Sequence, residues 1–91
     1  MATIKLTGRV FFEENVWLVE LPEIGQMTQA DSREHAQDEA ELLAREYFWA
    51  CQKVGHEGRP IQHVLDRFGL TADGPEPVIE VTLTYEDPAR T

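Results

Sequence analysis

The chain has 91 residues, of which 42% are hydrophobic and 27% are charged. This length fits one domain, and the ordinary globular composition argues against wholesale disorder. Seventeen acidic residues against eight Lys and Arg give a formal net charge of −9, which argues against direct binding of DNA or RNA because phosphate contacts need clustered basic side chains. The acidic surface serves either solubility or the encounter with a basic partner.

Alternation of hydrophobic and polar residues predicts three strands, over residues 3–12, 16–21 and 26–30. Asn15 suits a left-handed position in the hairpin loop after the first strand. Pro22 ends the second strand because proline cannot donate to a sheet ladder. These short connections predict an antiparallel meander, which needs cover on one face.

A long helix is predicted to supply that cover. Asp31 is expected to cap it and Glu34 to reach back to the cap, while Gly55 ends it just after Lys53. One face carries hydrophobic residues at three- and four-residue spacing: Ala36, Ala40, Leu43, Ala44, Tyr47, Cys51 and Val54. Three further residues outside this stripe either widen the buried face or form a second contact: Leu42, Phe48 and Trp49.

A second, shorter helix is predicted to open at Pro60 and to end at Gly69. Alternation returns in a last strand over residues 78–85, and residues 86–91 are expected to form a flexible tail. The sequence therefore predicts one α+β domain over residues 1–91, in the order β-β-β-α-α-β with the long helix covering the sheet.

Cys51 is the only cysteine, so an intramolecular disulfide is ruled out and a buried, inert thiol is expected. The first residues lack a hydrophobic signal core, and no apolar run approaches the roughly 18 residues of a membrane helix. We therefore expect a cytoplasmic protein without a membrane partner.

Residues 16–25, with the sequence VWLVELPEIG, resemble the aromatic-led second strand and the Pro-acid-apolar-Gly turn of HicB-type antitoxins. Residues 26–32, QMTQADS, resemble the link from this turn into the family's helix. Ala36 and Ala40 fit the inner face of that helix. The resemblance covers residues 3–50 and, more loosely, the last strand.

The resemblance implies a βββαβ domain with a partial ribonuclease-H-like fold. It also implies a cytoplasmic antitoxin that forms a dimer or larger assembly and binds and blocks HicA, a small basic RNA-cleaving toxin. Three departures stand out: residues 55–77 insert a short helix and a loop, Ala30 replaces a common glycine, and the chain is expected to be a short form without the family's C-terminal DNA-binding domain. Direct DNA binding is therefore not expected, and a member without a HicA partner stays open.

Candidate catalytic residues are sparse. A nuclease needs several carboxylates that converge on Mg²⁺, but Glu20 and Glu80 alternate away from the helix-covered face. No two histidines stand four residues apart, so surface positions are expected for His35, His56 and His63. We predict no catalytic residue, no metal site and no cofactor, and hence a protein that is not an enzyme.

The leading hypothesis is a non-enzymatic, antitoxin-like protein that binds a small basic toxin. Trp17, Glu20 and Glu23 are the predicted partner-binding residues. Homodimer contacts are predicted at Phe11, Phe48 and Trp49. The first and last strands are also long enough to pair with a second chain. One alternative is a solo oligomerising regulatory module without a toxin, and another is a degenerate nuclease-like domain that binds metal.

Overall fold

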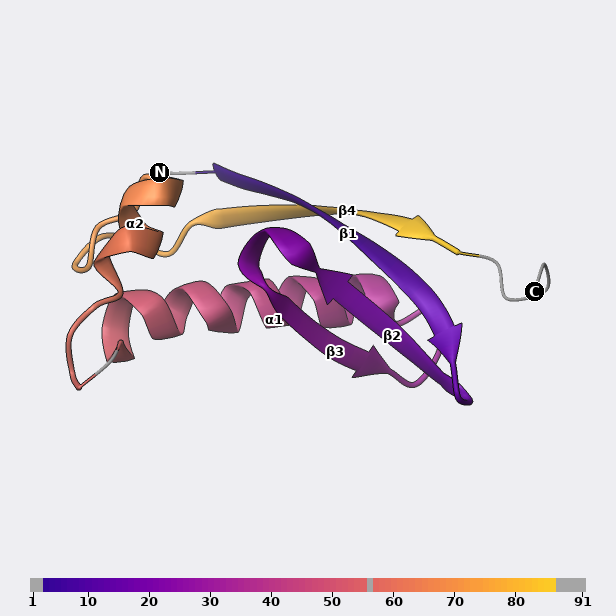
Figure 1. Cartoon of the computed structure of the whole chain (residues 1–91). Helices are drawn as coiled ribbons and strands as arrows, with labels where there is room; N and C mark the ends of the chain where they lie inside the picture. The colour runs from indigo at the N-terminus through magenta and orange to yellow at the C-terminus, as the bar shows by residue number, and fades with distance from the viewer. Residues whose placement is uncertain (1–2, 56, 87–91) are drawn as a thin grey trace.

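The computed structural model describes residues 3–55 and 57–86, so the predicted tail lies outside the described residues apart from Glu86. The elements in chain order are β1 (Thr3–Glu13), β2 (Val16–Leu21), the 3-10 turn η1 (Pro22–Ile24), β3 (Gln26–Ala30), α1 (Ala36–Trp49), the π-helical segment η2 (Ala50–Val54), α2 (Gln62–Phe68) and β4 (Val78–Tyr85) (Figure 1). This order confirms the predicted α+β class and the sequence β-β-β-α-α-β.

The strands form one sheet in the order β3-β2-β1-β4. β1 pairs antiparallel with β2, and β2 pairs antiparallel with β3, which confirms the meander. β4 pairs parallel with β1, because the chain crosses over through both helices before it returns to the sheet. β1 is therefore an internal strand, and the expectation that it offers a free edge for pairing is wrong.

The β1–β2 hairpin closes through two residues with positive φ, Glu14 at 51° and Asn15 at 67°. Two successive left-handed residues are typical of a type I′ turn, whose twist matches that of the flanking strands. The prediction for Asn15 is confirmed. The next turn, η1, ends at Gly25, which adopts φ 63°.

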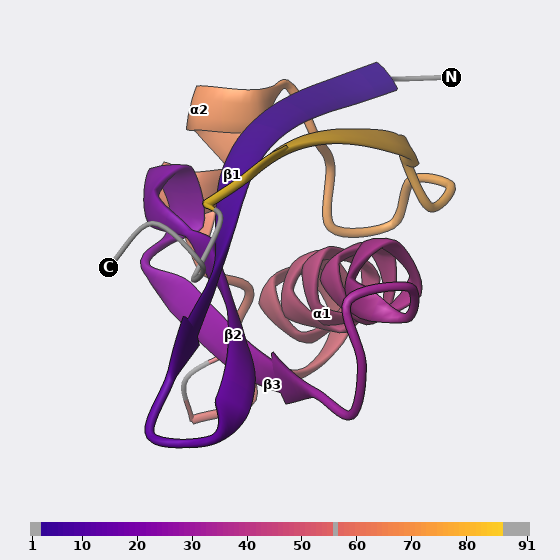
Figure 2. The ribbon, with the colours of Figure 1, turned by 90° about the vertical axis from the view of Figure 1, so that its right-hand side faces the viewer.

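The helix α1 lies on the concave side of the curved sheet, with β4 and β3 on either side of it (Figure 2). Ala36, Ala40 and Ala44 have no exposed surface, and their small side chains let the helix lie close to the sheet. Phe48, predicted outside the main stripe, is also fully buried because α2 packs against it. The centres of the Phe48 ring and of the Phe68 ring of α2 lie 4.9 Å apart.

The end of the long helix departs from ideal α-helical geometry. In η2 the Gly55 N–H donates to the Ala50 carbonyl at 2.7 Å, a bond that spans five residues. This wider turn frees the Cys51 carbonyl, which accepts a hydrogen bond from the Ile61 N–H at 2.9 Å. Val54, predicted on the buried stripe, is 50% exposed.

Both helices begin later than predicted. Residues 31–35 form bends and turns, α1 begins at Ala36, and the side chain of its N-cap residue His35 makes no capping bond. The Ser32 hydroxyl accepts a hydrogen bond from the His35 N–H at 3.3 Å. Asp31 instead contacts the His35 ring, so the predicted capping box is wrong. α2 begins at Gln62 rather than at Pro60. No helix in the described part of the chain has the length and apolar character needed to span a bilayer.

Candidate protein-binding surface

An apolar cluster lies on the sheet face that points away from α1. The neighbouring side chains Val10 and Val19 are fully buried in the core. Phe11 and Leu18, which lie opposite each other in the β1–β2 ladder, therefore point to the other face because side chains alternate along a strand. Both are half-buried.

Met27 extends this cluster onto β3. Glu20 pairs with Met27 and Leu18 pairs with Gln29, so Met27 is a diagonal neighbour of Leu18 on the same face. Met27 is 49% exposed. We call Phe11, Leu18 and Met27 the open-face cluster.

Arg9 connects this cluster to two acidic side chains. Its guanidinium lies 4.6 Å from the centre of the Phe11 ring, within the range of a cation–π contact. Arg9 Nε donates to Glu20 Oε1 at 2.7 Å, and Nη1 lies 3.3 Å from Glu86. The hydrogen bond to Glu20, and then its charge, raise the pKa of Arg9. The positive charge of Arg9 is thus matched by two carboxylates.

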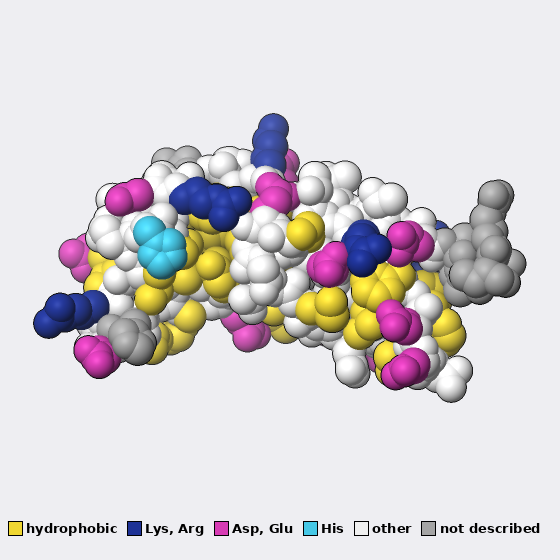
Figure 3. Space-filling model, in the orientation of Figure 1, with side chains coloured by type: hydrophobic (Ala, Val, Ile, Leu, Met, Phe, Trp, Pro, Cys, Tyr) yellow, Lys and Arg dark blue, Asp and Glu magenta, His cyan; other side chains and the backbone are white. Residues whose placement is uncertain are grey.

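Acidic residues flank the open-face cluster. Glu13 and Glu14 are exposed at the hairpin, whereas Glu20 lies four positions further along the ladder, opposite Arg9. In Figure 3 hydrophobic side chains gather at the hairpin end of the molecule, and most of the charged side chains beside them are acidic. This part of the surface combines apolar area with negative potential.

The structure does not bring the three predicted partner-binding residues together. Trp17 lies on the helix side of the sheet, where it packs against the core and meets the Phe12 ring edge-on at 5.0 Å. Glu20 points to the opposite face. Trp17 and Glu20 therefore belong to different surfaces.

Glu23 makes a structural contact within the domain. Its Oε1 accepts hydrogen bonds from the Thr7 backbone N–H at 2.6 Å and from Thr7 Oγ1 at 2.7 Å. The backbone bond, followed by the hydroxyl bond, lowers the pKa of Glu23. Because the β1–β2 ladder begins only at Arg9, Glu23 replaces the missing strand partner of Thr7.

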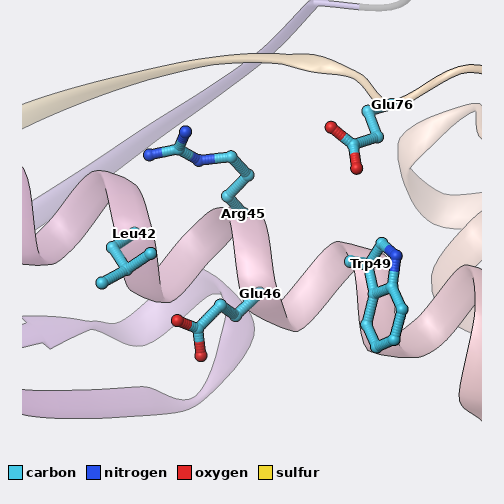
Figure 4. Close-up of a pocket in the computed structure, with 5 residues that line it drawn as sticks. All are labelled: Leu42, Arg45, Glu46, Trp49 and Glu76. Carbon is cyan, nitrogen blue, oxygen red and sulfur yellow. The ribbon is translucent and has the colours of Figure 1, made fainter.

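The three residues predicted to form dimer contacts also lie in different parts of the molecule. Phe11 belongs to the open-face cluster, whereas Phe48 is fully buried and has no surface to offer another chain, which corrects the prediction for that residue. Trp49 is 47% exposed on the outer side of α1. It borders a shallow pocket together with Leu42, Arg45, Glu46 and Glu76 (Figure 4).

The remaining candidates for chemistry lie apart. His35 Nδ1 contacts Asp31 Oδ1 at 2.6 Å on the exposed surface, and His56 lies outside the described residues. Cys51 is buried, and burial raises its pKa. Within residues 3–55 and 57–86, no group of three or more His, Cys, Asp or Glu side chains is placed to hold a metal ion.

Two members of the open-face cluster, Leu18 and Met27, were missed at the sequence level. Leu18 is out of phase with Trp17, Val19 and Leu21 in the alternation of its strand. An apolar residue on the polar phase of a strand was the available signal, as it was for Phe11.

Comparison with protein-family models, with curated proteins and with solved structures gives no match for this chain.

Proposed function

We propose that the protein is a non-enzymatic binding module of the HicB antitoxin type, which binds and inhibits a small basic RNA-cleaving toxin. The element order supports this proposal, since it follows the βββαβ order that the resemblance implies, apart from the departure already noted, the inserted helix α2. The proposal places the toxin on the open-face cluster.

The observation that carries the proposal is the apolar cluster flanked by acidic residues. Met27 is 49% exposed, and its neighbours Phe11 and Leu18 offer further apolar area on the same face. Interfaces combine a desolvated apolar centre with a polar rim. At the hairpin end Glu13 and Glu14 attract a basic protein and speed its encounter, whereas the charge of Glu20 is balanced by Arg9.

Co-expression tests the proposal in cells. The proposal predicts that a reading frame next to the gene of this chain encodes a small basic protein, and the chain is expressed together with the product of that neighbouring frame. We expect expression of the neighbour alone to arrest growth, and co-expression to restore growth and to yield a complex in size-exclusion chromatography. Arrest that persists, with the two proteins eluting separately, would contradict the proposal and favour a module without a toxin.

A further inference from the structure

The strand β4 carries a free edge for most of its length. Within residues 3–55 and 57–86 it is the last strand of the sheet order and pairs with β1 alone. The Glu86 N–H donates to the Val10 carbonyl at 2.8 Å, whereas the Val81 carbonyl accepts from the Gln37 side chain of α1 at 2.9 Å. The backbone N–H and C=O groups of the even-numbered residues of β4 therefore face β1. Those of the odd-numbered residues point to the free edge.

This edge is only partly protected against pairing. Natural edge strands are blocked by charged side chains, by proline, by bulges, by being very short or by a covering helix or loop, and here the protection consists of the Glu80 charge and of the Gln37 side chain at the Val81 carbonyl. β4 has eight residues, VIEVTLTY, with no lysine, proline or glycine. The other edge strand, β3, has five residues.

We propose that β4 pairs antiparallel with β4 of a second copy of this chain, around a two-fold axis at Thr82. In this register Val81 lies opposite Leu83 of the second copy, and Ile79 lies opposite Tyr85. All four residues belong to the core cluster or pack against it. Ile79, Leu83 and Tyr85 are half-buried in the single chain, and the pairing buries them further.

Charge and backbone chemistry favour this register over those with the axis at Glu80 or Val81. Around Thr82, the acidic side chain of Glu80 lies opposite Thr84. An axis at residue 80 places Glu80 opposite its own copy, and like charges in that position destabilise a sheet. An axis at Val81 places Tyr85 opposite Pro77, which has no N–H to donate.

Residues 33–41, from the bend before α1 into its first turns, carry charges that complement those of the second copy. Glu41 lies beside Ile79 at one end of β4, and the Arg33 guanidinium lies 4.6 Å from the centre of the Tyr85 ring at the other end. Because Ile79 meets Tyr85 of the second copy, Arg33 of that copy approaches Glu41. A two-fold axis repeats this pair, as expected of an isologous interface.

The contact from Gln37 is compatible with strand pairing. It occupies one of the two lone pairs of the Val81 carbonyl. The second lone pair remains for the Leu83 N–H of the second copy. The dimer forms without a toxin, so the inference stands independently of the proposed function.

Cysteine cross-linking tests the register in the full chain. Thr82 forms a non-hydrogen-bonded pair with its own copy, at a Cα separation of roughly 4.5 Å, which suits a disulfide. We therefore expect Thr82→Cys to give a covalent dimer on mild oxidation. The matched control is Thr84→Cys, an exposed residue on the same strand and the same face, which lies opposite Glu80 and stays uncross-linked.

Sedimentation of the unmodified chain completes the test. A dimer in solution, with cross-linking at position 82 and not at 84, supports the inference. A monomer at several hundred micromolar overturns it. A dimer that cross-links equally at both positions, or at neither, also overturns it because the contact then lies elsewhere.

Discussion

At the scale of single residues, Gly8 is a position in the sheet that leaves no room for a side chain. A Cβ atom there would lie 2.6 Å from Leu21 Cδ2 and 2.7 Å from the Glu20 carbonyl oxygen. Gly8→Ala is therefore expected to lower the free energy of unfolding by about 2 kcal/mol through overpacking. Gly25→Ala meets no neighbour within 4 Å but keeps a φ of 63°, and it should cost about 1 kcal/mol. Urea denaturation measures both, and the reverse ranking would contradict this packing.

His35 and Asp31 form an exposed, pH-sensitive pair. The Asp31 hydrogen bond, followed by its charge, raises the pKa of His35, and the same bond lowers the pKa of Asp31. The stabilisation is fully present below pH 6.5, the ordinary pKa of histidine, and is lost as the pH rises through the raised value. At the acidic end it is lost as the pH falls through the lowered pKa of Asp31.

Asp31→Asn is expected to bring the pKa of His35 back toward 6.5, which an NMR titration of the ring protons detects. Asp38→Asn is the control, because Asp38 acts on His35 through charge alone, so its effect should be smaller. An unchanged His35 titration in Asp31→Asn would show that the two side chains do not meet in solution.

At the scale of elements, Glu23 ties η1 to β1. Glu23→Ala removes both bonds to Thr7 and should lower the free energy of unfolding by about 1–2 kcal/mol at neutral pH. Because the pKa of Glu23 is lowered in the folded state, the difference from the unmodified chain should shrink as the pH falls through that pKa. Urea denaturation across pH checks this, with Glu76→Ala as a loop control that should have little effect. A constant difference across pH would contradict the role of the carboxylate.

The strands were the most predictable elements. Alternation located β2, β3 and β4 at their observed bounds, and Asn15 marked the hairpin. The late start of α1 was not predictable, because the Asp31 side chain bonds the His35 ring and the Ser32 hydroxyl accepts from the His35 N–H. Burial of Phe48 depends on α2, which is distant in sequence. The parallel β1–β4 pairing is likewise set by the crossover and not by any local pattern.

The binding surface was predictable only in part. Phe11 and Glu20 were identified, but the strand phase was not followed to Leu18 and Met27. Trp17 was predicted to bind a partner because of its residue type. Its position in β2, however, directs its side chain to the helix-covered side of the sheet, where it packs against the core. The function of a surface residue depends on its neighbours across strands, and strand register is a long-range property.

At the scale of the whole molecule, the two proposed contacts use separate surfaces. The open-face cluster lies on β1, β2 and β3, whereas the dimer uses the free edge of β4. Pairing of β4 therefore leaves the cluster exposed in each copy.

A net charge of −9 repels two copies at low ionic strength, so salt should strengthen the dimer and weaken binding of a basic partner.

The most direct measurement compares Met27→Lys with Leu42→Lys by calorimetric titration against the product of the neighbouring reading frame, which the proposal predicts to be a small basic protein. Both side chains are apolar and similarly exposed, at 49% and 44%, but Met27 lies in the open-face cluster and Leu42 on the outer side of α1. We predict that Met27→Lys weakens binding about tenfold or more, as for a central interface residue, while Leu42→Lys binds like the unmodified chain. Equal affinity of both variants, or loss in Leu42→Lys alone, would contradict the assignment of the open face as the binding surface.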